Sequence, residues 1–173
     1  MPTPSFAAPA AKIPPGRAAG QVPFHQTVEV LLVAPAGNTR ALFTQTFESS
    51  NWRLESAATP AEALLRLRDR PMAVLIYEDR EPPRAGVETE PWLVLLQETR
   101  NLVHPPKVII ASRQADDRMW AEVLHQGGYD VLPLPLESGE VIRTVSMAWL
   151  EWRHEYEAEP AGVPRAMAMG AGS

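Results

Sequence analysis

The sequence predicts an α/β fold: a doubly wound, five-stranded parallel sheet with helices on both faces. Short runs of β-branched and leucine residues alternate five times with segments whose apolar residues recur at helical spacing. Residues 72–76 form an uninterrupted apolar run, which is typical of a strand buried on both faces. The strand order 2-1-3-4-5 places this run in the middle of the sheet. Charged residues follow at 78–81, so we expect polar side chains at the carboxyl edge, where such folds bind ligands.

The first predicted strand covers residues 28–33, and a break at 34–37 separates it from a helix over 38–49. Asn38 or Thr39 is the expected cap of this helix, because short polar side chains accept hydrogen bonds from its first free amides. Helical spacing places four residues on its inner face: Leu42, Phe43, Thr46 and Phe47.

The second strand is predicted over residues 52–57, nearer an edge of the sheet, because polar and apolar residues alternate there. A helix start follows, with Thr59 as the cap, Pro60 in the first turn and Glu62 close behind. This helix ends before Pro71, at the start of the stretch that contains the third strand.

The second half of the chain continues the alternation. A loop over 81–91 exceeds the usual strand-to-helix connection of about 2 to 6 residues. A helix over 92–102 leads to the fourth strand at 108–111, and the next helix covers 116–126. Gly127 is suited to close that helix, because glycine readily ends helices.

The fifth strand is predicted at 131–132 and lies at an edge or a bulge, because Pro133 and Pro135 cannot donate to a sheet. The last helix covers 138–156. Two inner stripes are expected. The first is Met119, Trp120, Val123 and Leu124, and the second is Val141, Ile142, Val145, Trp149 and Trp152.

Composition excludes several classes of protein. A formal net charge of −5 argues against nucleic-acid binding, which requires Lys and Arg to neutralise phosphates. The lack of cysteine excludes disulfides, thiolate nucleophiles and zinc–thiolate sites. No apolar run approaches the roughly 18 to 20 residues of a membrane span, so we expect a cytoplasmic protein without membrane contact. We predict one domain over 27–156, between a disordered Pro/Ala-rich tail at 1–26 and a second disordered tail at 157–173.

Four segments in register resemble the receiver domain of two-component response regulators. Residues 51–64 follow the family's second strand and its "A..G.EAL" turn, with proline in place of the glycine. Residues 70–77 follow "RPDLVLLD", 107–112 look like "PVIVLT", and 123–136 look like "AL.AGA.DYL.KPF". The resemblance covers about 28–154 and implies a flavodoxin-like fold with a role in phosphorelay signal transduction in bacteria.

The resemblance also implies where the family's phosphoryl chemistry would lie. The acidic pair that holds Mg²⁺ falls on Ala34 and Pro35, whose side chains offer none of the oxygen ligands that this ion requires. The phosphoacceptor Asp falls on Tyr77, a phenol with an ordinary pKa of about 10 and a poor replacement for a carboxylate nucleophile.

Three further positions complete the comparison. The lysine that neutralises the phosphoryl group falls on Leu134, and the aromatic switch residue falls on Val131. Only the hydroxyl that hydrogen-bonds the phosphoryl group is kept, as Ser112. The sequence therefore indicates a degenerate pocket that uses no metal and no cofactor, with Tyr77 filling it and bonded to Ser112 or to water.

Two alternatives concern the acids after the third strand. If the chain is shifted by one or two residues against the family pattern, Glu78 or Asp79 becomes the phosphoacceptor. A one-residue shift of a buried strand would, however, turn each side chain to the opposite face of the sheet. Five acids are candidates to gather at the same edge of the sheet and bind a cation: Glu78, Asp79, Glu81, Asp116 and Asp117. The alternative is that these side chains remain solvated.

The leading hypothesis is a stand-alone pseudo-receiver, not an enzyme, that works without phosphorylation through protein contacts. Its partner is a second copy of the chain or another signalling protein, and the receiver resemblance implies the fourth and fifth helices with the fifth strand as the surface. Trp120, Trp149 and Trp152 are the candidate interface residues, because tryptophan is enriched in interface hot spots. The alternative is a sensor that binds a small molecule in the remodelled pocket.

Overall fold

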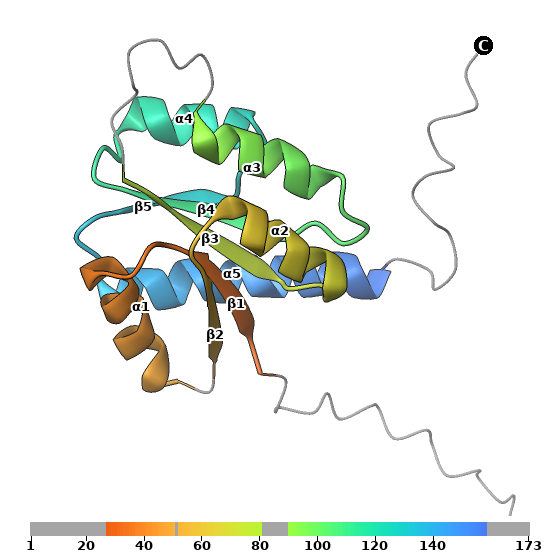
Figure 1. Cartoon of the computed structure of the whole chain (residues 1–173), viewed down its shortest axis with the longest axis horizontal. Helices are drawn as coiled ribbons and strands as arrows, with labels where there is room; N and C mark the ends of the chain where they lie inside the picture. Colours follow the sequence, from red (N-terminus) through yellow and green to blue (C-terminus); the bar gives the residue numbers. More distant parts are fainter. Residues whose placement is uncertain (1–26, 51, 81–89, 159–173) are drawn as a thin grey trace, which may run out of the picture.

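The computed structural model describes residues 27–50, 52–80 and 90–158, which form a central sheet between two layers of helices (Figure 1). The tail predicted at 1–26 and most of the loop predicted at 81–91 lie outside the described residues. So does the tail predicted at 157–173, except for its first two residues, which continue the last helix.

Strands and helices alternate along the whole described chain. Their bounds are β1 (Glu29–Val33), α1 (Asn38–Glu48), β2 (Arg53–Ala57), α2 (Pro60–Asp69), β3 (Val74–Asp79), α3 (Pro91–Arg100), β4 (Lys107–Ser112), α4 (Asp117–His125), β5 (Asp130–Pro133) and α5 (Ser138–Ala158). The predicted alternation is confirmed, with boundaries that differ by a few residues.

The sheet is parallel throughout, and its order is β2-β1-β3-β4-β5 (Figure 1). This is the predicted 2-1-3-4-5 order, with β3 in the centre between β1 and β4. Helices α1 and α5 cover one face, and α2, α3 and α4 cover the other (Figure 1). The predicted fold class is therefore confirmed.

The apolar run of β3 is buried on both faces, as its lack of alternation predicted. Val74 and Ile76 belong to the core cluster beneath α1 and α5, whereas Leu75 belongs to the cluster beneath α2, α3 and α4. All three are fully buried. Because side chains alternate across a strand, a central strand covered by helices on both sides needs apolar residues at every position.

Strand β3 lies further along the chain than predicted. The predicted apolar run covers 72–76, whereas β3 begins at Val74 and its pairing continues to Asp79, with Glu78 opposite Ala111 and Asp79 opposite Ser112 on β4. The backbone ladder continues as long as the neighbouring strand supplies partners, whatever the polarity of the side chains. The carboxyl edge therefore lies two residues beyond Tyr77.

The start of α1 differs from its prediction. The N-cap is Gly37, and no side chain caps the helix, so neither Asn38 nor Thr39 serves as the cap. Both residues already lie within the first turn, and Thr39 is buried against the core. Leu42 is 42% exposed, so its predicted place on the inner face of α1 is wrong. The buried face of this helix is narrower than the helical spacing of its apolar residues suggested.

The start of α2 follows its prediction. The Thr59 hydroxyl accepts a hydrogen bond from the amide of Glu62 at 3.2 Å, and Pro60 occupies the first turn. The Glu62 carboxylate in turn accepts from the amide of Ala58 at 2.9 Å. Two amides that the helix cannot pair are thus satisfied by local side chains.

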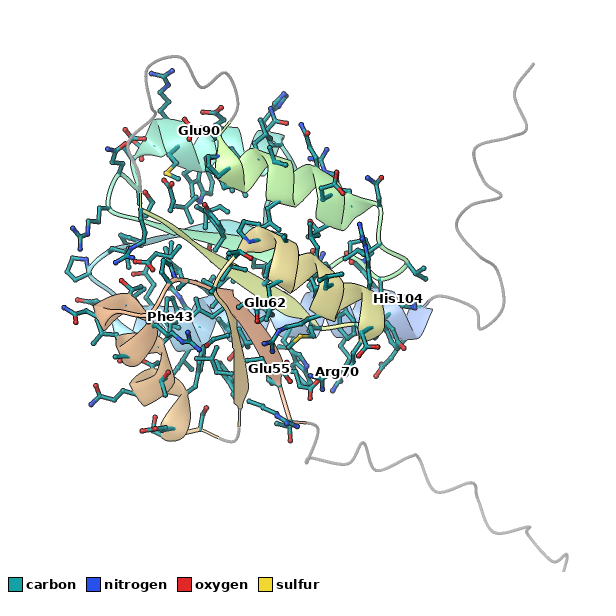
Figure 2. All side chains as sticks on the ribbon, viewed as in Figure 1. Phe43, Glu55, Glu62, Arg70, Glu90 and His104 are labelled. Carbon is teal, nitrogen blue, oxygen red and sulfur yellow. The ribbon has the colours of Figure 1, made fainter. Side chains whose placement is uncertain are left out.

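The far end of α2 is tied to β1 and β2 by ion pairs (Figure 2). The Arg70 guanidinium bonds Glu29 at 2.6 Å and also Glu55. Arg66 lies 3.4 Å from Glu55 and 2.7 Å from Glu62. One helix is thereby held in register with two neighbouring strands.

Two predicted inner stripes are narrower than expected. On α4 only Val123 is fully buried, and Trp120 is 49% exposed with its indole N–H donating to Asp130 at 3.0 Å. On α5 Val141 and Val145 are buried, but Ile142 is exposed. Within the described ranges, no helix combines the length and hydrophobicity needed to cross a membrane.

Candidate functional site at the carboxyl edge of the sheet

A pocket of about 380 Å³ opens at the carboxyl ends of β3 and β4, beside the segment that follows β5. The described residues that line it are Glu78, Asp79, Arg80, Ser112, Arg113, Gln114 and Leu134. Two carboxylates, two guanidinium groups and a hydroxyl therefore surround one small space, with Leu134 as its apolar wall. This is the edge at which doubly wound folds bind ligands.

Ser112 is held in one orientation. Its hydroxyl donates to Asp79 Oδ2 at 3.2 Å and accepts from the amide of Gln114 at 3.1 Å. Ser112 and Asp79 are direct neighbours in the β3–β4 ladder, so their side chains lie on the same face of the sheet. The hydroxyl proton is thus engaged with Asp79.

Glu78 is the most deeply buried acid of the pocket, with 6% of its surface exposed. Its Oε1 lies 3.3 Å from Arg80 Nε. Its Oε2 is buried and has no hydrogen-bond partner among the described residues. The carboxylate is therefore paired on one side only.

Arg80 extends from the end of β3 toward the turn after β1. Its Nη2 lies 3.5 Å from the place where a Cβ on Gly37 would stand. The guanidinium therefore lies between the Glu78 carboxylate and the turn that begins α1. The pocket contains a fixed positive charge of its own chain.

Comparisons of sequence find no family model and no curated protein that matches the chain. Solved structures do match. The signal receiver domain of a LuxO repressor protein from Vibrio parahaemolyticus is 18% identical, with a TM-score of 0.65 over 78% of this chain and 98% of that one. The signal receiver domain of an HD domain-containing protein from Pseudomonas fluorescens is 20% identical, with a TM-score of 0.63 over 77% and 94%.

A third match is the beryllofluoride-activated receiver domain of NtrC4, solved in solution as a dimer. It is 17% identical, with a TM-score of 0.57 over 73% of this chain and 99% of that domain. The chain has the receiver fold. At these identities the similarity concerns architecture, and the chemistry has to be judged from the residues themselves.

Two of the six positions inferred from the receiver resemblance line the pocket, Ser112 and Leu134. Leu134 brings no charge, and its amide donates to the Ser112 carbonyl at 2.9 Å. Val131 is buried in the core cluster beneath α2, α3 and α4 instead. Its side chain therefore has no access to the pocket.

The end of β1 contributes no side-chain oxygen to the pocket. Ala34 is fully buried, and its amide bonds the Ala57 carbonyl at 3.1 Å. Pro35 is exposed. Neither residue lines the pocket.

Tyr77 does not fill the pocket, contrary to its prediction. Its ring packs against the core cluster beneath α2, α3 and α4, one layer further from the edge than Asp79 on the same face of β3. The reason is the two-residue extension of β3, which brings Glu78 and Asp79 to the place assigned to the phenol.

The five acids named as a cation site do not all converge. Glu78 and Asp79 line the pocket, but Asp116 caps α4 by accepting from the Met119 amide at 2.8 Å. Asp117 lies in the first turn of α4, and Glu81 is outside the described residues. Among the residues that the structure describes, no group of three His, Cys, Asp or Glu side chains is arranged to hold a metal.

Sequence reasoning missed the two arginines of the pocket. Arg80 directly follows the last residue of β3, and Arg113 directly follows the last residue of β4. Cations immediately after two neighbouring parallel strands are a usable signal, because those strand ends meet at one edge. The signal requires the ends of the strands to be known within one residue.

The three candidate interface tryptophans differ in their surroundings. Trp149 and Trp152 pack against the core cluster beneath α1 and α5. Trp149 is also covered by the Arg153 guanidinium, 4.9 Å from its ring centre, and Trp152 stacks on Tyr156 at 4.7 Å. Trp120 alone among them presents about half of its surface to solvent.

Proposed function

We propose that this receiver-fold chain is a non-catalytic signalling module of the cytoplasm that acts through protein contacts and without phosphorylation. The single observation that carries the proposal is the ion pair between Glu78 and Arg80. The buried acid nearest the expected acceptor position is already neutralised by a guanidinium of its own chain, whereas phosphoryl transfer requires a free carboxylate nucleophile.

The residues present do not fit the magnesium ion that the receiver resemblance implies. Ala34 and Pro35 offer no side-chain oxygens, and Mg²⁺ requires near-octahedral oxygen coordination. The Arg80 guanidinium, 3.3 Å from Glu78, repels a second cation at that carboxylate. Leu134 supplies no ammonium to neutralise an incoming phosphoryl group.

A second candidate function is phosphorylation at Glu78 or Asp79. One observation favours it: both acids line the pocket, and the Ser112 hydroxyl lies 3.2 Å from Asp79. This arrangement places a carboxylate beside the one phosphoryl-binding residue that the receiver resemblance retains. The candidate lacks side-chain oxygens at Ala34 and Pro35 to hold Mg²⁺ and an ammonium group at Leu134, so it ranks second.

Incubation of the full chain with acetyl phosphate and Mg²⁺ tests both candidates. We expect the intact mass to remain unchanged, because the pocket does not combine a carboxylate acceptor with Mg²⁺ and an ammonium group. A receiver domain that keeps the acidic pair, the Asp and the Lys serves as the positive control. An added phosphoryl mass that disappears in Asp79→Asn or Glu78→Gln would establish the second candidate in place of the first.

We further propose that the contact surface comprises α4, β5 and α5, and that a second copy of the chain is the partner. Trp120 is half exposed on α4 and bonds Asp130 at the start of β5, so its ring lies where these elements adjoin. The NtrC4 receiver domain was solved as a dimer, which supports self-association as a property of this fold.

Trp120→Ala is expected to weaken self-association by about 2 kcal/mol, or roughly thirtyfold in Kd, because exposed tryptophans are frequent interface hot spots. Sedimentation equilibrium across a concentration series measures the effect. Leu65→Ala, which removes another exposed apolar side chain on α2, is the matched control and should change nothing. Equal Kd values for wild type and Trp120→Ala would contradict the proposed surface.

A further inference from the structure

We infer that the pocket at the carboxyl edge binds a small zwitterion, with the ligand's ammonium group on Glu78 and its anionic group on Arg113. The inference goes beyond the proposed function, which concerns protein contacts and requires no ligand. It rests on the charges, the burial and the volume of the pocket.

The first observation is the unsatisfied oxygen of Glu78. Its side chain is more than nine-tenths buried, yet Oε2 receives no hydrogen bond from the described residues. A buried charged oxygen without a donor is unfavourable, because it has lost water and gained nothing in return. Oε2 is closed to solvent in the structure, so a donor that gains access to it from the pocket forms a hydrogen bond that the described residues do not supply.

The second observation is that the surrounding protein groups do not supply this donor. Arg80 is engaged with the other oxygen, Oε1, and the Ser112 hydroxyl proton goes to Asp79. Leu134, which also lines the pocket, has no hydrogen-bond donor in its side chain. The donor has to be a ligand, and a carboxylate favours an ammonium group because charge-assisted hydrogen bonds are the stronger ones.

The third observation is a second positive charge in the lining of the pocket. Arg113 lines it, is exposed, and forms no ion pair with the described residues. A guanidinium with five fixed donors suits a carboxylate or a phosphate. Arg80 already compensates part of the Glu78 charge. A ligand that carries only a cation would therefore leave the Arg113 guanidinium without an anionic partner.

The volume limits the size of the ligand. About 380 Å³ lies near the lower end of the range of roughly 300 to 1,000 Å³ typical of small-molecule sites. An amino acid or a phosphorylated amino alcohol is of suitable size. A metal ion is disfavoured by Arg80, and a free phosphate would face both Glu78 and Asp79.

Calorimetric titration of the full chain provides the test. The probes are three zwitterions with increasing charge separation: glycine, β-alanine and phosphoethanolamine. Ethylamine carries only the cation, and acetate and inorganic phosphate carry only the anion. We expect at least one zwitterion to bind about tenfold more tightly than every single-charge probe, and to raise the melting temperature by mass action.

Variants then assign the two contacts. Glu78→Gln and Arg113→Gln should each weaken the best zwitterion about tenfold or more. Arg118→Gln on the exposed side of α4 is the matched control, because Arg118 does not line the pocket, and it should retain full affinity. Circular dichroism of each variant verifies folding, and Arg113→Gln is the safer variant because its side chain is exposed.

The outcomes separate the alternatives. If no probe binds, Oε2 does not accept a ligand donor and the inference is wrong. If ethylamine binds as well as the zwitterions, or if Arg113→Gln has no effect, the zwitterion class is also wrong. Intact-mass spectrometry on the same samples reports phosphorylation separately, so a failure of ligand binding leaves the proposed function untouched.

Discussion

Hydrogen bonds to single side chains determine how α2 begins. The Glu62 carboxylate accepts from the Ala58 amide and from Arg66, while the Thr59 hydroxyl accepts from the Glu62 amide. The hydrogen bond from the Ala58 amide, followed by that from Arg66, lowers the pKa of Glu62 below its ordinary value of 4.5. The folded state therefore favours the ionised form of the Glu62 carboxylate.

Because its pKa is lowered, Glu62 contributes to the stability of the fold in a way that depends on pH. Glu62 stabilises the fold above its unfolded pKa of 4.5, and the contribution disappears as pH falls through the lower folded pKa. We expect the difference in unfolding free energy between wild type and Glu62→Gln to shrink from about pH 6 to about pH 3. Urea denaturation at each pH measures it.

Leu65→Ala on the same helix is the control for that series, since it removes no titrating group and should leave a pH-independent difference from wild type. A wild-type advantage over Glu62→Gln that stays constant down to about pH 3 would show that the Ala58 bond does not select the ionised carboxylate.

Among the elements of the fold, β4 and α5 are joined by a lysine. The Lys107 ammonium bonds Glu151 and Glu155, both at 2.8 Å, and its side chain is only 16% exposed. Burial by itself lowers the pKa of Lys107, but the hydrogen bonds to the two carboxylates outweigh it, so the pKa lies above 10.5. The contact holds the last turns of the long helix against the amino edge of the sheet.

Lys107→Met should reduce the unfolding free energy by about 1 kcal/mol at neutral pH, a modest value because both carboxylates are half exposed. The difference from wild type persists below the unfolded pKa of 10.5 and disappears as pH rises through the higher folded pKa. Amide exchange should also quicken in α5 beyond Glu151. Denaturant titrations from neutral to strongly alkaline pH, with hydrogen exchange, measure both effects.

Arg143→Met is the matched control on α5, because Arg143 is exposed and forms no ion pair with the described residues. It should alter neither stability nor exchange appreciably. Unchanged exchange in Lys107→Met would mean that packing alone, through Trp152 and Tyr156, holds the end of the helix.

For the molecule as a whole, β3 connects the two core clusters. It is flanked by β1 and β4 and contributes side chains to both faces of the sheet. A cavity in this strand weakens packing on both sides, because the two cores share one backbone ladder. The described chain should therefore unfold as one cooperative unit.

Ile76→Ala is expected to lower the unfolding free energy by about 2 to 5 kcal/mol, the usual cost of emptying a fully buried aliphatic site. Circular dichroism and tryptophan fluorescence should report the same midpoint, since helices on both faces unfold together. Leu65→Ala, 66% exposed, is the control and should cost well under about 1 kcal/mol. Separate midpoints for the two probes would contradict a single cooperative unit.

Several parts of the fold were predictable from local pattern. The cap at Thr59 was predicted correctly, because capping depends on neighbours within a few residues. The α1 cap and the inward placement of Leu42 were wrong, because the rotation of a helix is decided by what it packs against. The pocket was predictable in location, but not in composition.

The sequence alone determined the alternation of strands and helices, the 2-1-3-4-5 order and the absence of charge at Ala34, Pro35 and Leu134. These follow from periodicity and from residue identity. Only the tertiary structure decided that β3 continues to Asp79 and that Arg80 neutralises one side of Glu78. The physical reason is that a strand ends where its neighbour stops pairing with it, and a charge is compensated by whichever group folding brings beside it.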